Sequence, residues 1–313
     1  MIGDGCVQDS GADVLHSLPR PVAAVLGGGG VLGAAHVGLG YALEHRGFVP
    51  DLIIGTSVGA LTGAITAAHP GSAARYLDDV WTGLRRREVF PIGHLASRSS
   101  ICGDRGLRRL IARAGLPRRI EQLPIPFTAV ATDLLTGEEA LLDHGDLESA
   151  LLASTAIPGV LPPTVRGNRT LVDGGVIAHV PVRAAERAGA ASVVVLSVGP
   201  ESQPMRLSTA PRRARAIAAR AKQLRLHHHI ESNLREVSEH IPTIVLPTGI
   251  EAWPGPWDFS QSRRLISTAS VTAGRFLDEL WVTGPGLYRA LDQPEAAFSR
   301  DQPTTTLSAG AAR

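Results

Sequence analysis

The stretch Leu52-Ile-Ile-Gly-Thr-Ser-Val-Gly-Ala-Leu-Thr-Gly-Ala-Ile-Thr-Ala-Ala68 decides the fold. Its apolar start predicts a short buried strand over Leu52–Gly55, and its alanine-rich remainder predicts a helix over Val58–Ala68. Between them, Gly55-Thr-Ser57-Val-Gly59 has the Gly-x-Ser-x-Gly form of an elbow that presents a serine at the end of a strand. A strand that turns directly into a helix indicates an α/β fold with a mainly parallel sheet.

The same strand–turn–helix pattern occurs once before the elbow, and its turn consists of glycines. Pro21–Leu26 is predicted to be a strand, Gly27–Leu32 a loop and Gly33–Arg46 a helix. Adjacent parallel strands would bring this loop to the edge of the sheet where Ser57 lies. Backbone N–H groups without neighbouring side chains can hold a negatively charged oxygen there, and the candidates are Gly28, Gly29 and Gly30.

The glycine loop also fits a different interpretation. Gly28-x-Gly30-x-x-Gly33 satisfies the dinucleotide-binding fingerprint, with a strand before it and a helix after it. That fingerprint expects an acidic residue near the end of the next strand, whereas Asp51 precedes that strand and Gly55-Thr-Ser57 occupies its end. A nucleotide-binding α/β protein therefore remains a remote alternative.

An elbow serine needs a group that accepts its proton. Asp173-Gly174-Gly175 follows a predicted strand over Thr170–Val172, and an aspartate in a dry cleft can act as the base without a histidine. Read alone, Asp-Gly-Gly is also a turn sequence. His179 gives the Ser-Asp-His order of a triad, although it follows Asp173 closely. We expect His36 to have a core or helix-face role within its helix and His227–His229 to lie on a solvated helix face.

The rest of the chain continues the alternation of strands and helices, so we expect one domain with a helical C-terminal section. Residues 20–292 are expected to form this domain, with core motifs over 23–199 and the helical section over 205–292. Residues 1–19 and 293–313 lack apolar periodicity and are expected to be poorly ordered. The further expected strands are Phe127–Thr132, Glu139–Leu142, Ser192–Val198 and Thr243–Leu246, and the further expected helices are Ala73–Arg87, Gly106–Ala114, Asp146–Ala153, Val182–Ala188, Ala210–His240 and Ser260–Leu280.

Composition excludes several classes. The chain has 313 residues, a formal charge of +2 and 44% apolar residues, which favours a globular core and gives nucleic-acid binding no support. Lys222 is the only lysine, so a phosphate-binding P-loop and Schiff-base chemistry are not expected. Cys6 and Cys102 supply neither a disulfide framework nor a zinc cluster, and a cytoplasmic location is the simplest expectation. The uncharged windows Val22–Leu43 and Leu52–Ala68 are interpreted as strand–turn–helix units instead of membrane spans.

Four segments, taken together with their order and spacing, resemble the patatin-like phospholipase family. The segment Ala131-Thr-Asp-Leu-Leu-Thr-Gly-Glu138 also looks like the middle strand and turn of that family. The resemblance covers about residues 23–199. The four segments are Leu26-Gly-Gly-Gly-Gly-Val-Leu-Gly33, Gly55-Thr-Ser-Val-Gly59, Ala153-Ser-Thr-Ala-Ile-Pro-Gly-Val-Leu-Pro162 and Leu171-Val-Asp-Gly-Gly-Val176 with Pro181.

The resemblance implies a three-layer α/β/α fold and hydrolysis of lipid acyl esters, of the phospholipase A, lysophospholipase or esterase type. Carried onto this chain, Ser57 is the nucleophile and Asp173 the general base, with no metal or cofactor. Gly28, Gly29 and Gly30 form the oxyanion hole, and the supporting glycines are Gly33, Gly55, Gly59, Gly174 and Gly175.

Two positions depart from the family pattern. Leu32 stands where the family usually has Arg or Lys, and Ala178-His179 replaces the usual polar pair after Asp-Gly-Gly. These departures keep a second hypothesis open, namely a catalytically weak or inactive lipid- or partner-binding protein on the same fold.

A lipid substrate also implies transient contact with a membrane surface, although a solvated helix face is the ordinary role of arginine clusters. The oligomeric state is left open. The basic clusters that could meet anionic head groups are Arg85–Arg87, Arg108–Arg109, Arg118–Arg119 and Arg212–Arg213.

Overall fold

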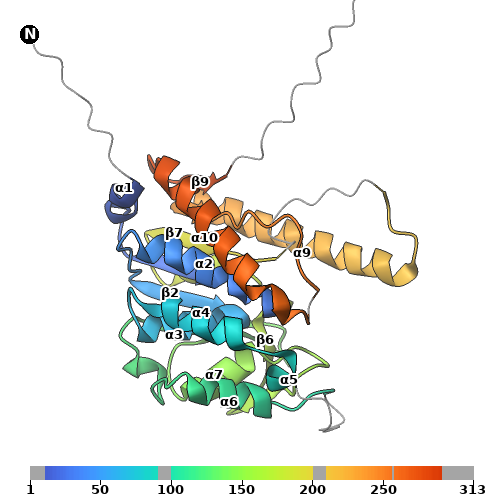
Figure 1. The fold of residues 1–313 in the computed structure, drawn as a ribbon. Helices are drawn as coiled ribbons and strands as arrows, with labels where there is room; N and C mark the ends of the chain where they lie inside the picture. Colours follow the sequence, from blue (N-terminus) through green and yellow to red (C-terminus); the bar gives the residue numbers. More distant parts are fainter. Residues whose placement is uncertain (1–10, 91–99, 200–208, 256, 291–313) are drawn as a thin grey trace, which may run out of the picture.

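The computed structural model describes residues 11–90, 100–199, 209–255 and 257–290, which form one mixed sheet with helices on both faces (Figure 1). The strand order is β5-β6-β3-β2-β1-β7-β8-β9, and β4 pairs separately with β3. All pairs from β3 to β9 along this order are parallel, whereas β4, β5 and β6 pair antiparallel, so the predicted α/β class is confirmed. The strands are β1 (Val22–Leu26), β2 (Leu52–Thr56), β3 (Phe127–Asp133), β4 (Glu139–Leu142), β5 (Thr164–Arg166), β6 (Arg169–Asp173), β7 (Ser192–Leu196), β8 (Pro242–Val245) and β9 (Gly286–Arg289).

Alternate residues of the central strand face two separate cores. In β1, Ala24 and Leu26 join the core on one face of the sheet, and Ala23 and Val25 join the core on the other. Strands buried on both faces explain the uninterrupted apolar runs in the sequence. The first core is covered by α2 (Ala34–Glu44), α3 (Val58–Ala68), α4 (Ala73–Gly83) and α10 (Ser262–Glu279), and the second by α8 (Val182–Arg187) and the C-terminal part of α9 (Ala214–Ser238).

The beginning of the described chain differs from the expectation. Residues 11–18 were expected to be poorly ordered, but α1 (Gly11–Ser17) packs against α10, and Leu15 and Leu18 are buried in the core. Seven residues are too few to show helical periodicity, so packing and not local sequence stabilises α1. Residues 1–10 and the expected C-terminal tail, 293–313, lie outside the described residues.

Three further elements differ from the sequence-based expectation. The helix expected over Ala73–Arg87 ends at Gly83, because Leu84 is extended, and a separate short helix, α5 (Arg86–Val89), follows. The short edge strands β5 and β9 were not expected. In the C-terminal section, β8 corresponds to the strand expected over Thr243–Leu246, and β9 adds a further strand beside it. The remaining helices are α6 (Arg105–Arg113), α7 (Leu147–Ser154) and the 3₁₀ turns η1 (Gly30–Gly33), η2 (Ile120–Gln122), η3 (Gly174–Val176) and η5 (Phe259–Gln261).

Both uncharged windows fold as strand, turn and helix. Val22–Leu43 contains β1, η1 and most of α2, and Leu52–Ala68 consists of β2, the elbow and α3. Within the described residues, no helix combines the length and apolar character needed to cross a bilayer.

Candidate active site

Ser57 occupies a strained turn between β2 and α3. Its φ of 57° and ψ of −124° make it the one non-glycine residue with positive φ in the described chain. The turn is possible because the residues two positions before and after Ser57 are glycines, which have no side chain. A Cβ on Gly55 would lie 2.4 Å from the carbonyl oxygen of Gly59, and a Cβ on Gly59 would lie 2.3 Å from that of Leu26. The predicted elbow therefore forms, and the two glycines allow α3 to pack directly on β1.

The middle strand β3 brings the ends of two other strands together. Thr56, the last residue of β2, pairs with Val130, and Asp173, the last residue of β6, pairs with the adjacent Ala131. Because β2 and β6 both end at this level, Ser57 Oγ donates a hydrogen bond of 2.6 Å to Asp173 Oδ2. The two residues lie 116 positions apart in the sequence and are both buried.

The Asp173 carboxylate is held from its other side as well. The Oδ1 atom of Asp173 accepts a hydrogen bond of 2.7 Å from the N–H of Gly175. The hydroxyl of Thr132 donates a hydrogen bond to the main-chain carbonyl oxygen of Asp173. Burial raises the pKa of Asp173 above its ordinary value, against the lowering effects of the hydrogen bonds from Ser57 and Gly175 and of nearby His179. A carboxylate fixed in this way, with raised proton affinity, can accept the proton of Ser57.

The glycine loop meets the elbow, and the amide of Gly28 is paired within the protein. The N–H of Gly28 donates to the carbonyl oxygen of His179 over 2.9 Å, so it is not available to an oxyanion in this conformation. By contrast, the N–H groups of Gly29 and Gly30 have no hydrogen-bond acceptor among the described residues. Gly30, whose φ is 57°, also lines the cavity beside Ser57. The candidate oxyanion donors are thus Gly29 and Gly30, with Gly28 anchoring the loop.

Ser154 is a site residue that sequence reasoning missed. This fully buried serine, the last residue of α7, accepts a hydrogen bond of 2.9 Å from the N–H of Ser57 and donates one of 2.6 Å to the carbonyl oxygen of Val130. It therefore ties the backbone of the elbow to β3. The segment Ala153–Pro162 was noticed in the sequence, but nothing in its pattern distinguishes this hydroxyl from that of the neighbouring Thr155.

The two histidines considered near the candidate site, His36 and His179, lie in different surroundings. His36 is buried, bonds to the carbonyl oxygen of Leu196, and burial lowers its pKa to about 4, in agreement with a core role. The ring of His179 lies against the glycine loop, because a Cβ on Gly28 would be 3.1 Å from its Nδ1. The single hydroxyl proton of Ser57 is directed to Asp173, so the Ser-Asp-His arrangement is not formed here.

The expected solvated face at His227–His229 is partly occupied by a contact with the body. His229 Nε2 lies 2.9 Å from the carbonyl oxygen of Ile177, although the side chain remains exposed. In the described part of the chain, His, Cys, Asp and Glu side chains form no group suited to a metal ion.

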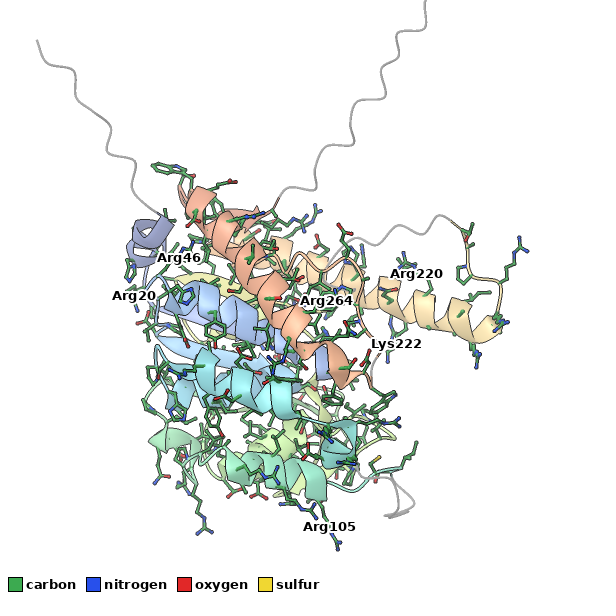
Figure 2. All side chains as sticks on the ribbon, in the orientation of Figure 1. Arg20, Arg46, Arg105, Arg220, Lys222 and Arg264 are labelled. Carbon is green, nitrogen blue, oxygen red and sulfur yellow. The ribbon has the colours of Figure 1, made fainter. Side chains whose placement is uncertain are left out.

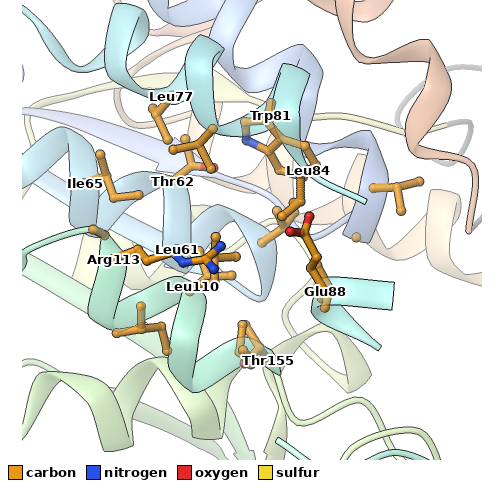
Figure 3. A pocket seen from close by; sticks show the side chains of 18 of the residues that line it. Leu61, Thr62, Ile65, Leu77, Trp81, Leu84, Glu88, Leu110, Arg113 and Thr155 are labelled. Atoms are coloured by element: carbon orange, nitrogen blue, oxygen red, sulfur yellow. The ribbon is translucent and has the colours of Figure 1, made fainter. Parts of the chain in front are cut away.

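An apolar cavity of about 310 Å³ opens beside Ser57 (Figure 3). One wall is the face of α3 that runs from Ser57 through Leu61 to Ile65. Leu77 and Trp81 of α4 and Leu110 of α6 line other sides, and in Figure 3 their side chains surround a common space. The charged residues of the lining, Asp79, Glu88 and Arg113, are themselves exposed. The cavity thus suits a hydrocarbon chain better than a polar group.

A serine on a strand-to-helix elbow, within a mainly parallel sheet, is typical of α/β serine hydrolases. Comparison with known families makes the class more specific. The sequence pattern of the family described as patatin-like phospholipase matches residues 24–186, just over half of the chain, and the chain belongs to this family.

Curated relatives support the same grouping. An NTE family protein of Mycobacterium tuberculosis is 36% identical over 191 residues, which are 61% of this chain and 52% of that protein. Human patatin-like phospholipase domain-containing protein 6 is 31% identical over 186 residues, 58% of this chain and 14% of that protein. The matched region is thus about half the length of the mycobacterial relative and a small part of the human one.

Among solved structures, VipD from Legionella pneumophila is similar over 83% of this chain and 67% of that chain, with a TM-score of 0.45 and 15% identity.

Proposed function

We propose that this protein is a serine acyl hydrolase that cleaves lipid acyl esters, with residues 20–292 as the hydrolase domain. Ser57 is the nucleophile, Asp173 is the general base, and the amides of Gly29 and Gly30 stabilise the oxyanion. The observation that carries this proposal is the 2.6 Å hydrogen bond to Asp173 from Ser57, which lines the apolar cavity.

The first half of the reaction acylates the serine. Asp173 accepts the proton of Ser57 while Oγ attacks the ester carbonyl, whose oxygen becomes negatively charged. The amides of Gly29 and Gly30 face no protein acceptor in the described chain and can donate to this oxygen. The ester C–O bond then breaks, and Asp173 returns its proton to the leaving alcohol.

The second half releases the acyl group. Asp173, again ionised, removes a proton from water, and the resulting hydroxide attacks the acyl–Ser57 ester. Collapse of the second oxyanion restores the Ser57 hydroxyl, which takes the proton from Asp173, and frees a carboxylic acid. One water is consumed for each ester cleaved.

The cavity supports an acyl chain of medium length as the preferred group. Its wall from Ser57 to Ile65 is about 12 Å long at the helical rise of ~1.5 Å per residue. Its volume of about 310 Å³ accommodates on the order of ten methylene groups, if each is roughly the size of a water molecule at ~30 Å³. Burying each methylene contributes ~0.8 kcal/mol, so kcat/KM should rise about fourfold per methylene until the cavity is full.

The experiment is a series of p-nitrophenyl esters of increasing chain length, assayed with the wild type, Ser57→Ala and Asp173→Asn. We expect kcat/KM to rise with chain length and level off near ten carbons, and both variants to lose at least a thousandfold while remaining folded. Leu61→Trp, which narrows the cavity, should move the plateau to shorter chains. Full activity in either dyad variant would refute the assigned chemistry. No hydrolysis by the folded wild type would favour a lipid-binding protein without catalysis.

A further inference from the structure

The first part of α9 extends beyond the body of the molecule. Ile230, Leu234 and Val237 near its C-terminus are buried against the second core. The preceding turns, from Ala214 to His229, contain no buried residue, and Figure 1 shows this part of the helix projecting away from the sheet. Because this helix packs on the body over only its last turns, most of its surface makes no contact with the described residues.

The projecting part carries only one sign of charge. Residues 209–230 contain no Asp or Glu, while Arg212, Arg213, Arg215, Lys222 and Arg225 are all exposed. None of these five forms an ion pair with the described residues. Figure 2 shows Arg220 and Lys222 on this extended segment, whereas Arg105 lies on the body of the molecule. We call residues 212–229 the cationic arm.

The cationic arm also exposes aliphatic side chains on one face. Ile217 and Leu224 are each 49% exposed. They are seven residues apart, which is two helical turns, so they lie on one side of the helix with Ala221 between them. Positively charged residues beside an exposed aliphatic stripe are typical of helices that lie at a lipid–water interface.

The other basic clusters of the chain are partly neutralised. Arg108 pairs with Asp104 and Glu148, and Arg119 pairs with Glu121. Arg86 lies over the ring of Trp257, at 5.4 Å from its centroid. Of the basic clusters considered from sequence, Arg212–Arg213 is therefore the one in which no member has an ion-pair or ring partner among the described residues.

The C-terminal end of the cationic arm lies beside the loop of the candidate base. His229, at the end of the arm, lies within hydrogen-bonding distance of the carbonyl oxygen of Ile177, four residues after Asp173. The arm is therefore attached to the body next to the loop that follows Asp173.

We propose that the cationic arm is the docking surface for anionic lipid membranes, and that it brings the enzyme to its substrate. The choice of a lipid partner rests on the proposed function. Two other partners fit less well: a second arm would be repelled by its like charge, and a nucleic acid would leave the aliphatic stripe of Ile217 and Leu224 unpaired.

The test is sedimentation with phosphatidylcholine vesicles, with and without phosphatidylserine, at low and high salt. The variant Arg215→Ala/Lys222→Ala/Arg225→Ala should bind the anionic vesicles on the order of a hundredfold more weakly than the wild type. Wild-type binding should require phosphatidylserine and decrease with salt. The matched control Arg75→Ala/Arg105→Ala/Arg109→Ala removes three exposed arginines from α4 and α6 and should bind within about threefold of the wild type.

Two further measurements separate this inference from the proposed function. Ser57→Ala should bind vesicles like the wild type, and the arm variant should hydrolyse a soluble short-chain ester at the wild-type rate. Equal vesicle binding by the arm and control variants would overturn the proposal. Two other results would also overturn it. In the first, the wild type is a dimer and the arm variant is a monomer. In the second, the wild type binds DNA more tightly than vesicles, and the arm variant loses this DNA binding.

Discussion

The elbow and the cationic arm differ in how their polar groups are held, since those of the elbow are buried and hydrogen-bonded and those of the arm are exposed. At the elbow, Ser57, Ser154 and Asp173 are buried and linked by hydrogen bonds to one another and to β3. Along the arm, Arg215, Lys222 and the other cations are exposed and touch little of the body. Bond-making chemistry depends on distances of a few tenths of an ångström, whereas attraction to a charged surface depends on the sum of charges.

This difference has a consequence for mutational sensitivity. Substitutions at the elbow should alter stability and activity strongly and individually, because each group fills a fixed position. Substitutions in the arm should leave folding unchanged and act roughly additively on membrane binding.

The largest effect on stability is expected where the elbow backbone is most crowded. Gly59→Ala places a Cβ 2.3 Å from the carbonyl oxygen of Leu26, so α3 must move away from β1. We expect a loss of roughly 3 kcal/mol in the free energy of unfolding, measured by urea denaturation. The matched control is Gly274→Ala in α10, where the added methyl meets nothing within 4 Å. It should stabilise the chain by about 0.5–1 kcal/mol; a Gly59→Ala variant as stable as this control would contradict the crowded elbow.

A smaller loss of stability is expected when Ser154, the buried hydrogen-bond partner of the Ser57 backbone, is replaced. Ser154→Ala leaves the N–H of Ser57 and the carbonyl oxygen of Val130 without their partner. The cost should be about 1–3 kcal/mol in unfolding free energy, together with a lower kcat and little change in KM. Ser267→Ala on the exposed face of α10 removes a hydroxyl bonded only to Arg264 and should change stability by less than ~0.5 kcal/mol. Equal effects in the two variants would remove Ser154 from the site.

The next effect concerns the pH dependence of stability. Burial raises the pKa of Asp173 above the value of about 3.9 expected in an unfolded chain. The stability linked to this group is therefore fully present below about pH 3.9 and is lost as the pH rises through the folded-state pKa. We expect Asp173→Asn to be more stable than the wild type at pH 7, with a difference that shrinks on acidification.

The control for this prediction has the opposite sign. Hydrogen bonds from Ser260 lower the pKa of Asp258, a half-buried residue, so its contribution is present at neutral pH and lost on acidification. Asp258→Asn should consequently not be more stable than the wild type at pH 7. A stabilised Asp258→Asn, or a destabilised Asp173→Asn, would contradict the electrostatic contrast between the two sites.

The smallest effect is expected in the arm. Arg215→Ala/Lys222→Ala/Arg225→Ala should change the free energy of unfolding by no more than ~0.5 kcal/mol, because these side chains are exposed and unpaired within the described chain. Urea denaturation of the variant beside the wild type measures this directly. A loss comparable to that of Ser154→Ala would show that the arm packs on the body.

The sequence was informative where chemistry requires a local pattern. A strand that ends in Gly-x-Ser-x-Gly has few ways to turn, so β2, the elbow and α3 were predicted together, with the bounds of α3 matching residue for residue. Asp173 was also predicted as a candidate, because the glycines after it mark a close approach of two backbones.

The parts that escaped prediction depend on distant residues. Whether the N–H of Gly28 faces a substrate or the carbonyl oxygen of His179 is decided by how the loop after β6 packs. The role of Ser154 likewise follows from the position of α7 beside β3. α1 and β9 are short, and their sequences carry no periodic signal strong enough to distinguish them from loops.

The most direct test of the central claim is labelling with a fluorophosphonate that carries an alkyl chain, followed by peptide mapping. We expect one adduct, on Ser57, whose formation slows sharply in Asp173→Asn and is absent in Ser57→Ala. Labelling of folded Ser57→Ala at the wild-type rate, or an adduct on another serine of the wild type, would contradict it.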